Sequence, residues 1–436
     1  MKQENKYAFS LFVIGTLFFV FGFITWINGI LMPFLKASCE LTTFQASFVP
    51  FAFYISYFFM AIPSSFLIKK VGYSGGMMLG LLTMAIGAIL FVPAASTRQF
   101  PLFLTGLFIQ GGGLTLLQAA SNPYATILGP IETAARRISI MGVCNKLAGV
   151  IGFYTLYKAL FSGMQQELQM IENGMLTGEA KDLALQNLSE QVILPYVIIT
   201  AVFILLVLFI KLAKLPQIEQ QTAEQGGEHR SIFSYPYMWL GVFAIFFYVG
   251  AEVIAIDYLI PYGKSLHLAD SATKNFPIYA MFALIVGYFV GLLTVPKMIS
   301  QRHALIAHLC IAIGLASVAI CSKTLVHFFN PSLAPDELFS MSARLSISCI
   351  IMLSFAHAIM WPAIWPLSIH DLGKHTEVAS GLLVMACAGG GVMSLIYGKL
   401  CELPHIGHQS AYSLLFVCYF YILFFATFGY KFQEKK

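Results

Sequence analysis

The sequence predicts an all-α integral membrane protein with twelve transmembrane helices in two pseudo-symmetric halves of six. Three observations support this fold class. The chain of 436 residues is 58% hydrophobic and only 10% charged. Its apolar residues gather in twelve long, continuous runs. A short phrase near the end of the first run is repeated in the first long run after the midpoint of the chain.

The composition excludes a soluble globular protein. Such a protein carries about a quarter charged residues, whereas this chain has 25 basic and 20 acidic residues. Its mean hydropathy of +0.79 and its aromatic content of 14% suit surfaces that face lipid. The net charge of +5 is spread over loops, so we expect a lipid bilayer and no nucleic acid as partner. The eight cysteines lack metal-ligand spacing, so we expect no metal, cofactor or disulfide framework.

Each predicted span is an apolar run of about 20 residues or more, the length that crosses a bilayer as a helix. The first run is too long for the core of a signal peptide, and no small-residue cleavage site follows it, so we predict a retained span. The spans are predicted at residues 8–34, 44–68, 75–95, 101–127, 138–161, 191–213, 236–262, 276–296, 303–322, 344–368, 377–399 and 410–430.

The distribution of lysine and arginine predicts that both termini are cytoplasmic. With this topology the cytoplasmic segments hold 15 of these residues and the outer segments hold 8. An excess of basic residues on the cytoplasmic side is the usual pattern for membrane proteins. We therefore expect a multi-pass protein of a bacterial inner membrane.

Two polar segments lie between spans. Residues 162–190 are predicted to form an outer loop that is partly helical, and residues 215–235 a flexible cytoplasmic linker. The linker divides the chain into an N-terminal six-helix half, 1–214, and a C-terminal six-helix half, 236–436. Related halves of this kind are typical of transporters with a substrate site between them.

The repeated phrase is the sequence evidence that the two halves are related. Residues 28–36 align with residues 256–264 at an offset of about 228, proline on proline and lysine on lysine. The alignment places Gly29 opposite Asp257, so the halves differ by a carboxylate at this position. Trp26 and Asn28, just before and at the start of this phrase, are candidate substrate-binding residues, with lipid contact as the alternative for Trp26.

Spans four and five supply candidate amide ligands. Gln118, Asn122 and Thr126 are spaced four apart and form a polar stripe on one face of a helix. Amides donate and accept hydrogen bonds, which suits a ligand with hydroxyl groups. Asn145 in span five is a further candidate. The alternative is that these residues form hydrogen bonds between helices.

Ionisable residues inside a span are costly and usually functional. Lys146 in span five and Glu252 and Asp257 in span seven are such residues. We expect an acid to hold the Lys146 ammonium, either Glu252 or Asp257 in one conformational state, or otherwise carbonyl groups and water. Glu252 and Asp257 are about 140° apart around a helix, so they are predicted not to share a face.

Span ten contains the strongest candidate site. His357, Trp361 and Trp365 are spaced four apart and lie within about 80° of one another on a helix. Aromatic rings stack on the apolar face of a sugar, and polar groups bind its hydroxyls. Pro362 and Pro366 are predicted to break or kink the helix. The alternative makes the tryptophans anchors at the lipid interface and His357 an interhelical hydrogen-bonder.

The chain resembles the fucose–galactose–glucose symporter family of the major facilitator superfamily. The phrase Gln-Ala-Ala-Ser-Asn-Pro-Tyr at 118–124, with Leu-Gly-Pro at 128–130 and Glu-Thr-Ala-Ala-Arg-Arg at 132–137, is similar to the span-four signature of that family. The segments 28–34, 144–149, 248–253 and 360–366 resemble its other motifs, and the similarity covers essentially the whole chain. The glucose/galactose transporter branch is the part of the family that the chain resembles most.

The resemblance implies a monomer that takes up sugar by alternating access, usually in symport with protons and in some members with sodium. In the proton-coupled fucose permeases two carboxylates matter. They fall on Gly29 and Gln118 of this sequence, so both acids are missing here. The loop at 67–76 also departs from the gating motif of the superfamily. The resemblance therefore implies the fold and the substrate class and leaves the coupling mechanism open.

One hypothesis places the coupling groups in the C-terminal half. Asp257 lies opposite Gly29, and an alignment of spans four and ten places His357 opposite Gln118. A carboxylate and an imidazole inside the membrane suit reversible proton binding. The alternative makes Asp257 a fixed structural partner and transport sodium-driven or uncoupled. The sequence leaves the sugar open among hexoses, 6-deoxyhexoses and N-acetylhexosamines.

Two other functional classes compete with secondary sugar transport. A non-transporting sugar sensor on the same scaffold is expected to carry a long soluble extension, whereas the tails predicted here are a few residues long. A membrane-embedded enzyme needs a nucleophile with a base or paired carboxylates, and we find no such constellation. We therefore predict a transporter and no enzyme activity.

Overall fold

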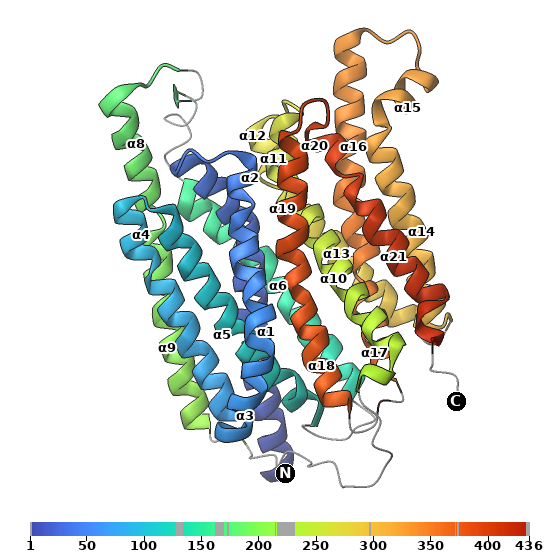
Figure 1. Cartoon of the computed structure of the whole chain (residues 1–436). Helices are drawn as coiled ribbons and strands as arrows, with labels where there is room; N and C mark the ends of the chain where they lie inside the picture. The colour runs from blue at the N-terminus through green and yellow to red at the C-terminus, as the bar shows by residue number, and fades with distance from the viewer. Residues whose placement is uncertain are drawn as a thin grey trace. The chain divides into compact units, whose positions relative to one another are not determined.

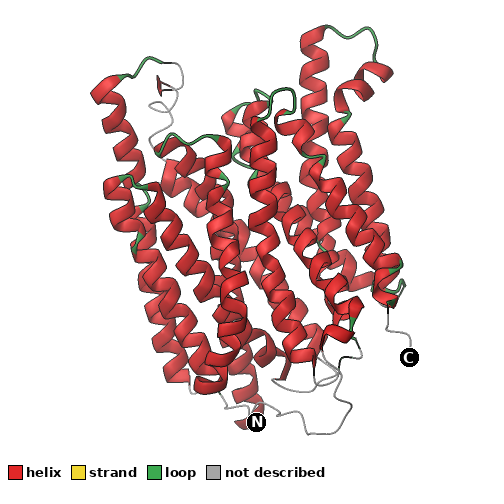
Figure 2. Ribbon diagram, viewed as in Figure 1, coloured by secondary structure: helices red, strands yellow, loops and turns green. Residues whose placement is uncertain are grey.

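The chain folds into helices joined by loops and turns (Figure 2). The computed structural model describes residues 2–127, 134–161, 170–171, 174–213, 215, 232–295, 298–370, 372 and 375–432. Most of the predicted linker 215–235, part of the predicted outer loop and the motif segment 128–133 lie outside the described residues. The chain divides into two compact units, Met1–Thr222 and Ala223–Lys436.

The N-terminal unit contains the helices labelled α1 to α9 in Figure 1. Long helices alternate with short helices at the ends of spans. Their bounds are α1 Lys2–Ser38, α2 Thr43–Ala46, α3 Phe48–Ile89, α4 Phe91–Thr97, α5 Phe100–Ile127, α6 Ala134–Phe161, α8 Gly178–Glu190 and α9 Ile193–Ala213.

The C-terminal unit contains helices α10 to α21, with short 3-10 turns at 232–234, 386–388 and 429–431. Several of its spans are divided into two helices. The bounds are α10 Pro236–Asp257, α11 Leu259–Ser265, α12 Asp270–Thr273, α13 Phe276–Thr294, α14 Gln301–Ile320, α15 Ser322–Phe329, α16 Pro335–His357, α17 Met360–Ile369, α18 Thr376–Met385, α19 Gly389–Glu402, α20 Gly407–Ala411 and α21 Leu414–Thr427.

Ten helical stretches of the described chain are long and apolar enough to cross a membrane. One of them, Thr43–Thr97, covers 55 residues and contains two predicted spans, 44–68 and 75–95. The helix breaks between them at Gly72, whose φ of 73° and ψ of 173° are not helical. A positive φ favours glycine because it has no Cβ. The 28-residue helix α6 accounts for the remaining predicted span, 138–161.

Equivalent spans pack against each other in the two units. In the N-terminal unit α1 packs along α6, and α3 packs along α5. In the C-terminal unit α10 packs along α19, and α16 packs along α13 and α14. In span numbers, the first span pairs with the fifth, and the fourth pairs with the second and third. This shared pattern agrees with the internal repeat in the sequence.

A glycine permits the close approach of the first and fifth spans in each unit. A Cβ built on Gly22 of α1 would lie 1.8 Å from the backbone oxygen of Asn145 in α6. Gly250 of α10 lies at the same offset of about 228 residues, and a Cβ there would lie 2.4 Å from Cγ of Met393 in α19. Both helix pairs therefore approach more closely than an alanine allows.

A glutamine also caps the same helix end in each unit. In the N-terminal unit the Gln186 amide donates to the carbonyls of Ala95 and Ser96 at 3.3 and 3.2 Å, near the end of the third span. In the C-terminal unit the Gln409 amide donates to the carbonyls of Ala319 and Ile320 at 2.9 and 3.2 Å, at the end of α14. Carbonyls at a helix end lack intrahelical donors, which explains the need for a cap.

The segment 162–190, which the sequence predicted to be a partly helical outer loop, contains helix α8. Two ion pairs connect α8 to neighbouring loops of the same unit. Lys181 lies 2.5 Å from a carboxylate oxygen of Glu40, and Arg98 lies 3.8 Å from one of Asp182. Exposed ion pairs of this kind stabilise a protein by less than about 1 kcal/mol. They hold α8 in place rather than supporting the fold.

Replacing Gly22 by alanine is expected to destabilise the N-terminal unit, because the new methyl group would overlap the backbone of α6. Overpacking of this kind costs about 1–3 kcal/mol. The midpoint of thermal unfolding in detergent measures the effect. Gly142→Ala in α6 is the matched control, because a Cβ there meets nothing within 4 Å. Equal unfolding midpoints for the two variants would contradict the close approach at Gly22.

Candidate functional site

Trp26, Asn145 and Lys146 form one cluster in the N-terminal unit. The side chain of Trp26 on α1 is 3% exposed, so it is buried rather than in contact with lipid. Its indole nitrogen donates to Oδ1 of Asn145 on α6 at 3.4 Å. The Asn145 amide in turn donates to the carbonyl of Phe18 at 3.4 Å. The close approach at Gly22 brings these polar groups together.

Lys146 lies on the ring of Trp26. Its ammonium is 4.1 Å from the ring centroid, and the residue is 7% exposed. A buried cation on a tryptophan face is stabilised by about 2 kcal/mol, because the face of the ring is electron-rich. The sequence predicted an acid, a carbonyl or water as the partner of Lys146 and missed the ring. Pairing with Glu252 or Asp257 stays a prediction.

Gln118 and Asn122 lie on α5 of the same unit. The Gln118 amide donates to the hydroxyl of Tyr57 at 3.3 Å, and the ring of Tyr57 stacks with that of Tyr54. Both amide residues are partly exposed. The side chains of Asn28 and Thr126 lie outside the described part of the chain. Tyr57 is a polar neighbour that the sequence analysis did not identify.

Tyr248 connects the candidate residues of the C-terminal unit. This residue of α10 is buried, and it lies close enough to the Glu252 carboxylate, one helical turn away, to interact with it. Its ring lies 6.1 Å from that of Trp361 and 6.4 Å from that of His357, measured between centroids. Tyr288 on α13 is also close enough to Glu252 to interact with its charge. The carboxylate therefore lies in an aromatic and phenolic environment.

The predicted tenth span is broken, as its prolines indicated. Helix α16 ends at His357, and α17 begins at Met360. Pro362 has no N–H, so it cannot bond the carbonyl of Ala358 in the turn between the helices. The Trp361 and Trp365 rings lie on α17 with centroids 5.2 Å apart and planes at 31°. Both tryptophans are partly exposed, so they form a contiguous aromatic surface.

His357 is fully buried and bonds within the unit. Its Nε2 atom lies 2.8 Å from the hydroxyl of Tyr419 on α21. This is the interhelical hydrogen bond that the alternative interpretation predicted. The contact with Tyr248 still places His357 in the same cluster as Trp361. A role for His357 in sugar binding or coupling stays a prediction.

Asp257 is the last residue of α10 and is 3% exposed. The chain leaves helical geometry at Tyr258, with φ −95° and ψ 4°, before α11 begins. Asp257 lies within electrostatic range of Glu252, five positions earlier in the chain, although the sequence predicted different faces. Two buried carboxylates in one low-dielectric region are costly, and a bound proton removes one of the two charges.

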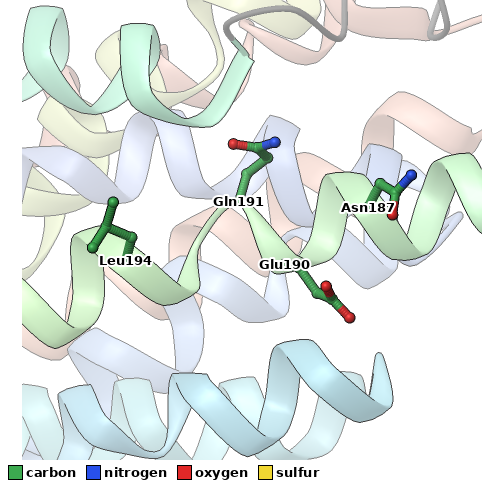
Figure 3. Close-up of a pocket in the computed structure, with 4 residues that line it drawn as sticks. All are labelled: Asn187, Glu190, Gln191 and Leu194. Carbon is green, nitrogen blue, oxygen red and sulfur yellow. The ribbon is translucent and has the colours of Figure 1, made fainter.

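A surface pocket lies where α8 meets α9. Asn187, Glu190, Gln191 and Leu194 line it, as Figure 3 shows. None of these residues was a candidate in the sequence. Among the described residues that line the pocket, one is acidic and none is aromatic, so they provide no stacking surface for a sugar.

The residues that the sequence analysis missed are mostly tyrosines. Four tyrosines either hydrogen-bond a candidate residue or lie close enough to interact with its charged group: Tyr57, Tyr248, Tyr288 and Tyr419. Tyr248 begins the segment 248–253 that resembles a family motif, but neither spacing nor neighbours distinguishes the other three among the 20 tyrosines of the chain. Their roles follow from contacts between helices that are distant in sequence.

Comparisons with known proteins agree with this architecture. The model of the Major Facilitator Superfamily matches residues 14–395. The glucose/galactose transporter of Brucella abortus biovar 1 (strain 9-941) is 30% identical over 434 residues, covering 99% of this chain and 96% of that protein. The L-fucose-proton symporter of Escherichia coli (strain K12) is 30% identical over 409 residues, covering 92% and 88%.

A solved structure is similar over the same length. The crystal structure of the Major Facilitator Superfamily transporter FucP in the outward conformation matches with a TM-score of 0.72 and 27% identity, covering 99% of this chain and 100% of that chain. Similarity of sequence and of fold thus extends from one end of the chain to the other. The chain belongs to the major facilitator superfamily and, within it, to the fucose–galactose–glucose symporter family.

Proposed function

We propose that this protein is a secondary transporter that takes up a monosaccharide by alternating access in symport with protons. The substrate class is a hexose, a 6-deoxyhexose or an N-acetylhexosamine. We further propose that it acts as a monomer in a bacterial inner membrane with both termini in the cytoplasm. Its relatives named above are transporters and symporters of glucose, galactose and fucose, which supports the substrate class.

The observation that carries the proposal is the aromatic surface of Trp361 and Trp365, which Tyr248 connects to a buried carboxyl group. Trp361 contacts Tyr248, and Tyr248 lies close enough to Glu252 to interact with its carboxylate. Tryptophan rings cover the apolar face of a pyranose, and carboxylate and phenol groups accept and donate hydrogen bonds to its hydroxyls. Tyr248 thus connects the surface on which the sugar stacks to a buried carboxyl group.

We propose roles for the individual residues in each unit. In the N-terminal unit the amides bind sugar hydroxyls, and Trp26 is a further aromatic contact. In the C-terminal unit the tryptophans stack on the ring. The proposed sugar-binding residues are Trp26, Asn28, Gln118, Asn122, Asn145, His357, Trp361 and Trp365. The proposed coupling residues are Lys146, Glu252, Asp257 and His357.

The buried carboxyl groups favour cation symport over uniport, and the L-fucose-proton symporter among the relatives favours the proton as the cation. Glu252 is 7% exposed and Asp257 is 3% exposed, and their charges interact. A uniporter has no need of two costly buried acids in one span. A sodium symporter and a non-transporting sensor are the other outcomes that the experiments below separate.

Counterflow in proteoliposomes tests the proposed substrate class. Vesicles loaded with an unlabelled sugar take up the same labelled sugar transiently above equilibrium if the protein transports it. The panel contains glucose, galactose, fucose, mannose and N-acetylglucosamine, and protein-free vesicles are the control. We expect counterflow with at least one of these sugars. Specific binding without counterflow would instead indicate a sensor. The absence of both binding and counterflow would contradict the proposal.

A further inference from the structure

A glutamine from a neighbouring helix fills a hydrogen-bonding gap in α17. Pro366 lies inside this helix and has no N–H, so the carbonyl of Pro362, one turn earlier, lacks its usual donor. The Gln301 amide donates to this carbonyl at 2.8 Å. It also donates to the carbonyl of Ala363 at 3.0 Å. One side chain therefore bonds two consecutive carbonyls at the weak point of α17.

Gln301 is itself held in place. It is the first residue of α14, and Ser300 caps that helix by accepting from the backbone N–H of His303 at 3.4 Å. The next residue, Arg302, donates to the carbonyl of Ala426 near the end of α21 at 2.9 Å. The start of α14 is thus bonded to two other helices of the same unit. The backbone at the start of α14 is therefore fixed, and this gives the side chain of Gln301 a defined direction.

The other end of α17 is also bonded to its unit. The Tyr237 hydroxyl of α10 donates to the carbonyl of His370, directly after α17. The helix therefore has two attachments, Gln301 at its proline and Tyr237 at its end. Trp361 and Trp365 extend from the ten residues of α17, and their surface has the orientation that these attachments impose.

We propose that Gln301 is a positioning residue for the Trp361–Trp365 surface. It acts by replacing the hydrogen bond that Pro366 removes, and so fixes the orientation of α17. This inference rests on the proposed function, because the consequence is a change in sugar affinity. A hydrogen bond to a backbone carbonyl contributes about 1 kcal/mol, which corresponds to about a five-fold change in affinity. Gln301 itself contacts no sugar in this account.

A double-mutant cycle tests the inference. Gln301→Leu removes the donors and keeps a similar volume. Pro366→Ala restores an N–H that can bond the Pro362 carbonyl and makes Gln301 redundant. We expect Gln301→Leu to weaken sugar binding about five-fold in the wild-type background and by less than about two-fold in the Pro366→Ala background. If Gln301→Leu does not fold, Gln301→Asn, one methylene shorter, takes its place.

Hydrogen exchange of the α17 amides, measured without sugar, gives a second readout. Gln301→Leu is expected to speed exchange in residues 360–369, and Pro366→Ala to reverse this increase. Gln409→Leu is the matched control, because it removes the same kind of carbonyl cap from the other end of α14. It is expected to lower thermal stability without changing sugar affinity or exchange in α17.

Two results would overturn the inference. The first is an equal loss of affinity on Gln301→Leu in both backgrounds. The second is unchanged exchange in α17 on Gln301→Leu. If the wild-type protein binds no sugar of the panel, the proposed function fails, while the exchange experiment still decides whether Gln301 holds α17.

Discussion

Asp257→Asn is expected to abolish proton-driven accumulation of sugar while exchange of sugar across the membrane continues. Asparagine has nearly the shape of aspartate and is polar, with an NH2 donor in place of one acceptor oxygen, but it cannot carry the transported proton. Asp257 is 3% exposed, and its charge interacts with that of Glu252. The variant therefore removes the change in charge that couples proton movement to sugar movement. It preserves the packing of α10.

Uptake and counterflow in proteoliposomes measure these two properties separately. Asp336→Asn in the first turn of α16 is the matched control, because this carboxylate is exposed, and it is expected to behave like wild type. His357→Gln tests the second of the two coupling residues that the sequence hypothesis places in the C-terminal half, in the same assay. Accumulation at the wild-type level by both Asp257→Asn and His357→Gln would exclude coupling through these residues.

Trp361→Ala is expected to weaken sugar binding by about ten-fold or more, which corresponds to about 1.4 kcal/mol. The reason is the loss of the ring that contacts both Trp365 and Tyr248, and with it the stacking surface. Equilibrium binding of labelled sugar to the purified variant gives the affinity. Circular dichroism and the unfolding midpoint establish that the variant is folded.

Trp239→Ala is the control for the loss of a tryptophan. Trp239 lies on α10 of the same unit and lines an apolar surface pocket with Leu240, Phe243, Phe424 and Phe432. Its removal is expected to change stability and to leave sugar affinity within about two-fold of wild type. Unchanged affinity in Trp361→Ala would remove the tryptophan surface from the account.

The elements that sequence predicts well are those that local chemistry determines. Apolar runs fix the spans, because backbone groups in lipid must bond within a helix. Proline removes a donor wherever it occurs, so the break before Pro362 was predictable. Gly72 occurs between two predicted spans and takes a positive φ, as an isolated glycine in such a loop can.

The features that sequence did not predict depend on contacts between distant segments. From sequence alone, Trp26 is equally consistent with a binding residue and with a lipid contact. Only its packing against α6 shows that it is buried under Lys146. The helical wheel placed Glu252 and Asp257 on different faces, and it contains no information on their electrostatic interaction near the end of α10. Gln301 lies 61 residues from Pro362, so no local pattern reveals their hydrogen bond.

Accumulation of labelled sugar against its gradient, driven by an imposed pH gradient in proteoliposomes, tests the central claim most directly. A gradient of one pH unit stores about 1.4 kcal/mol per proton and supports about ten-fold accumulation at a ratio of one proton per sugar. We predict accumulation that a protonophore abolishes and that a sodium gradient alone does not produce. Equilibration without accumulation under a pH gradient, or accumulation that only a sodium gradient drives, would contradict proton symport.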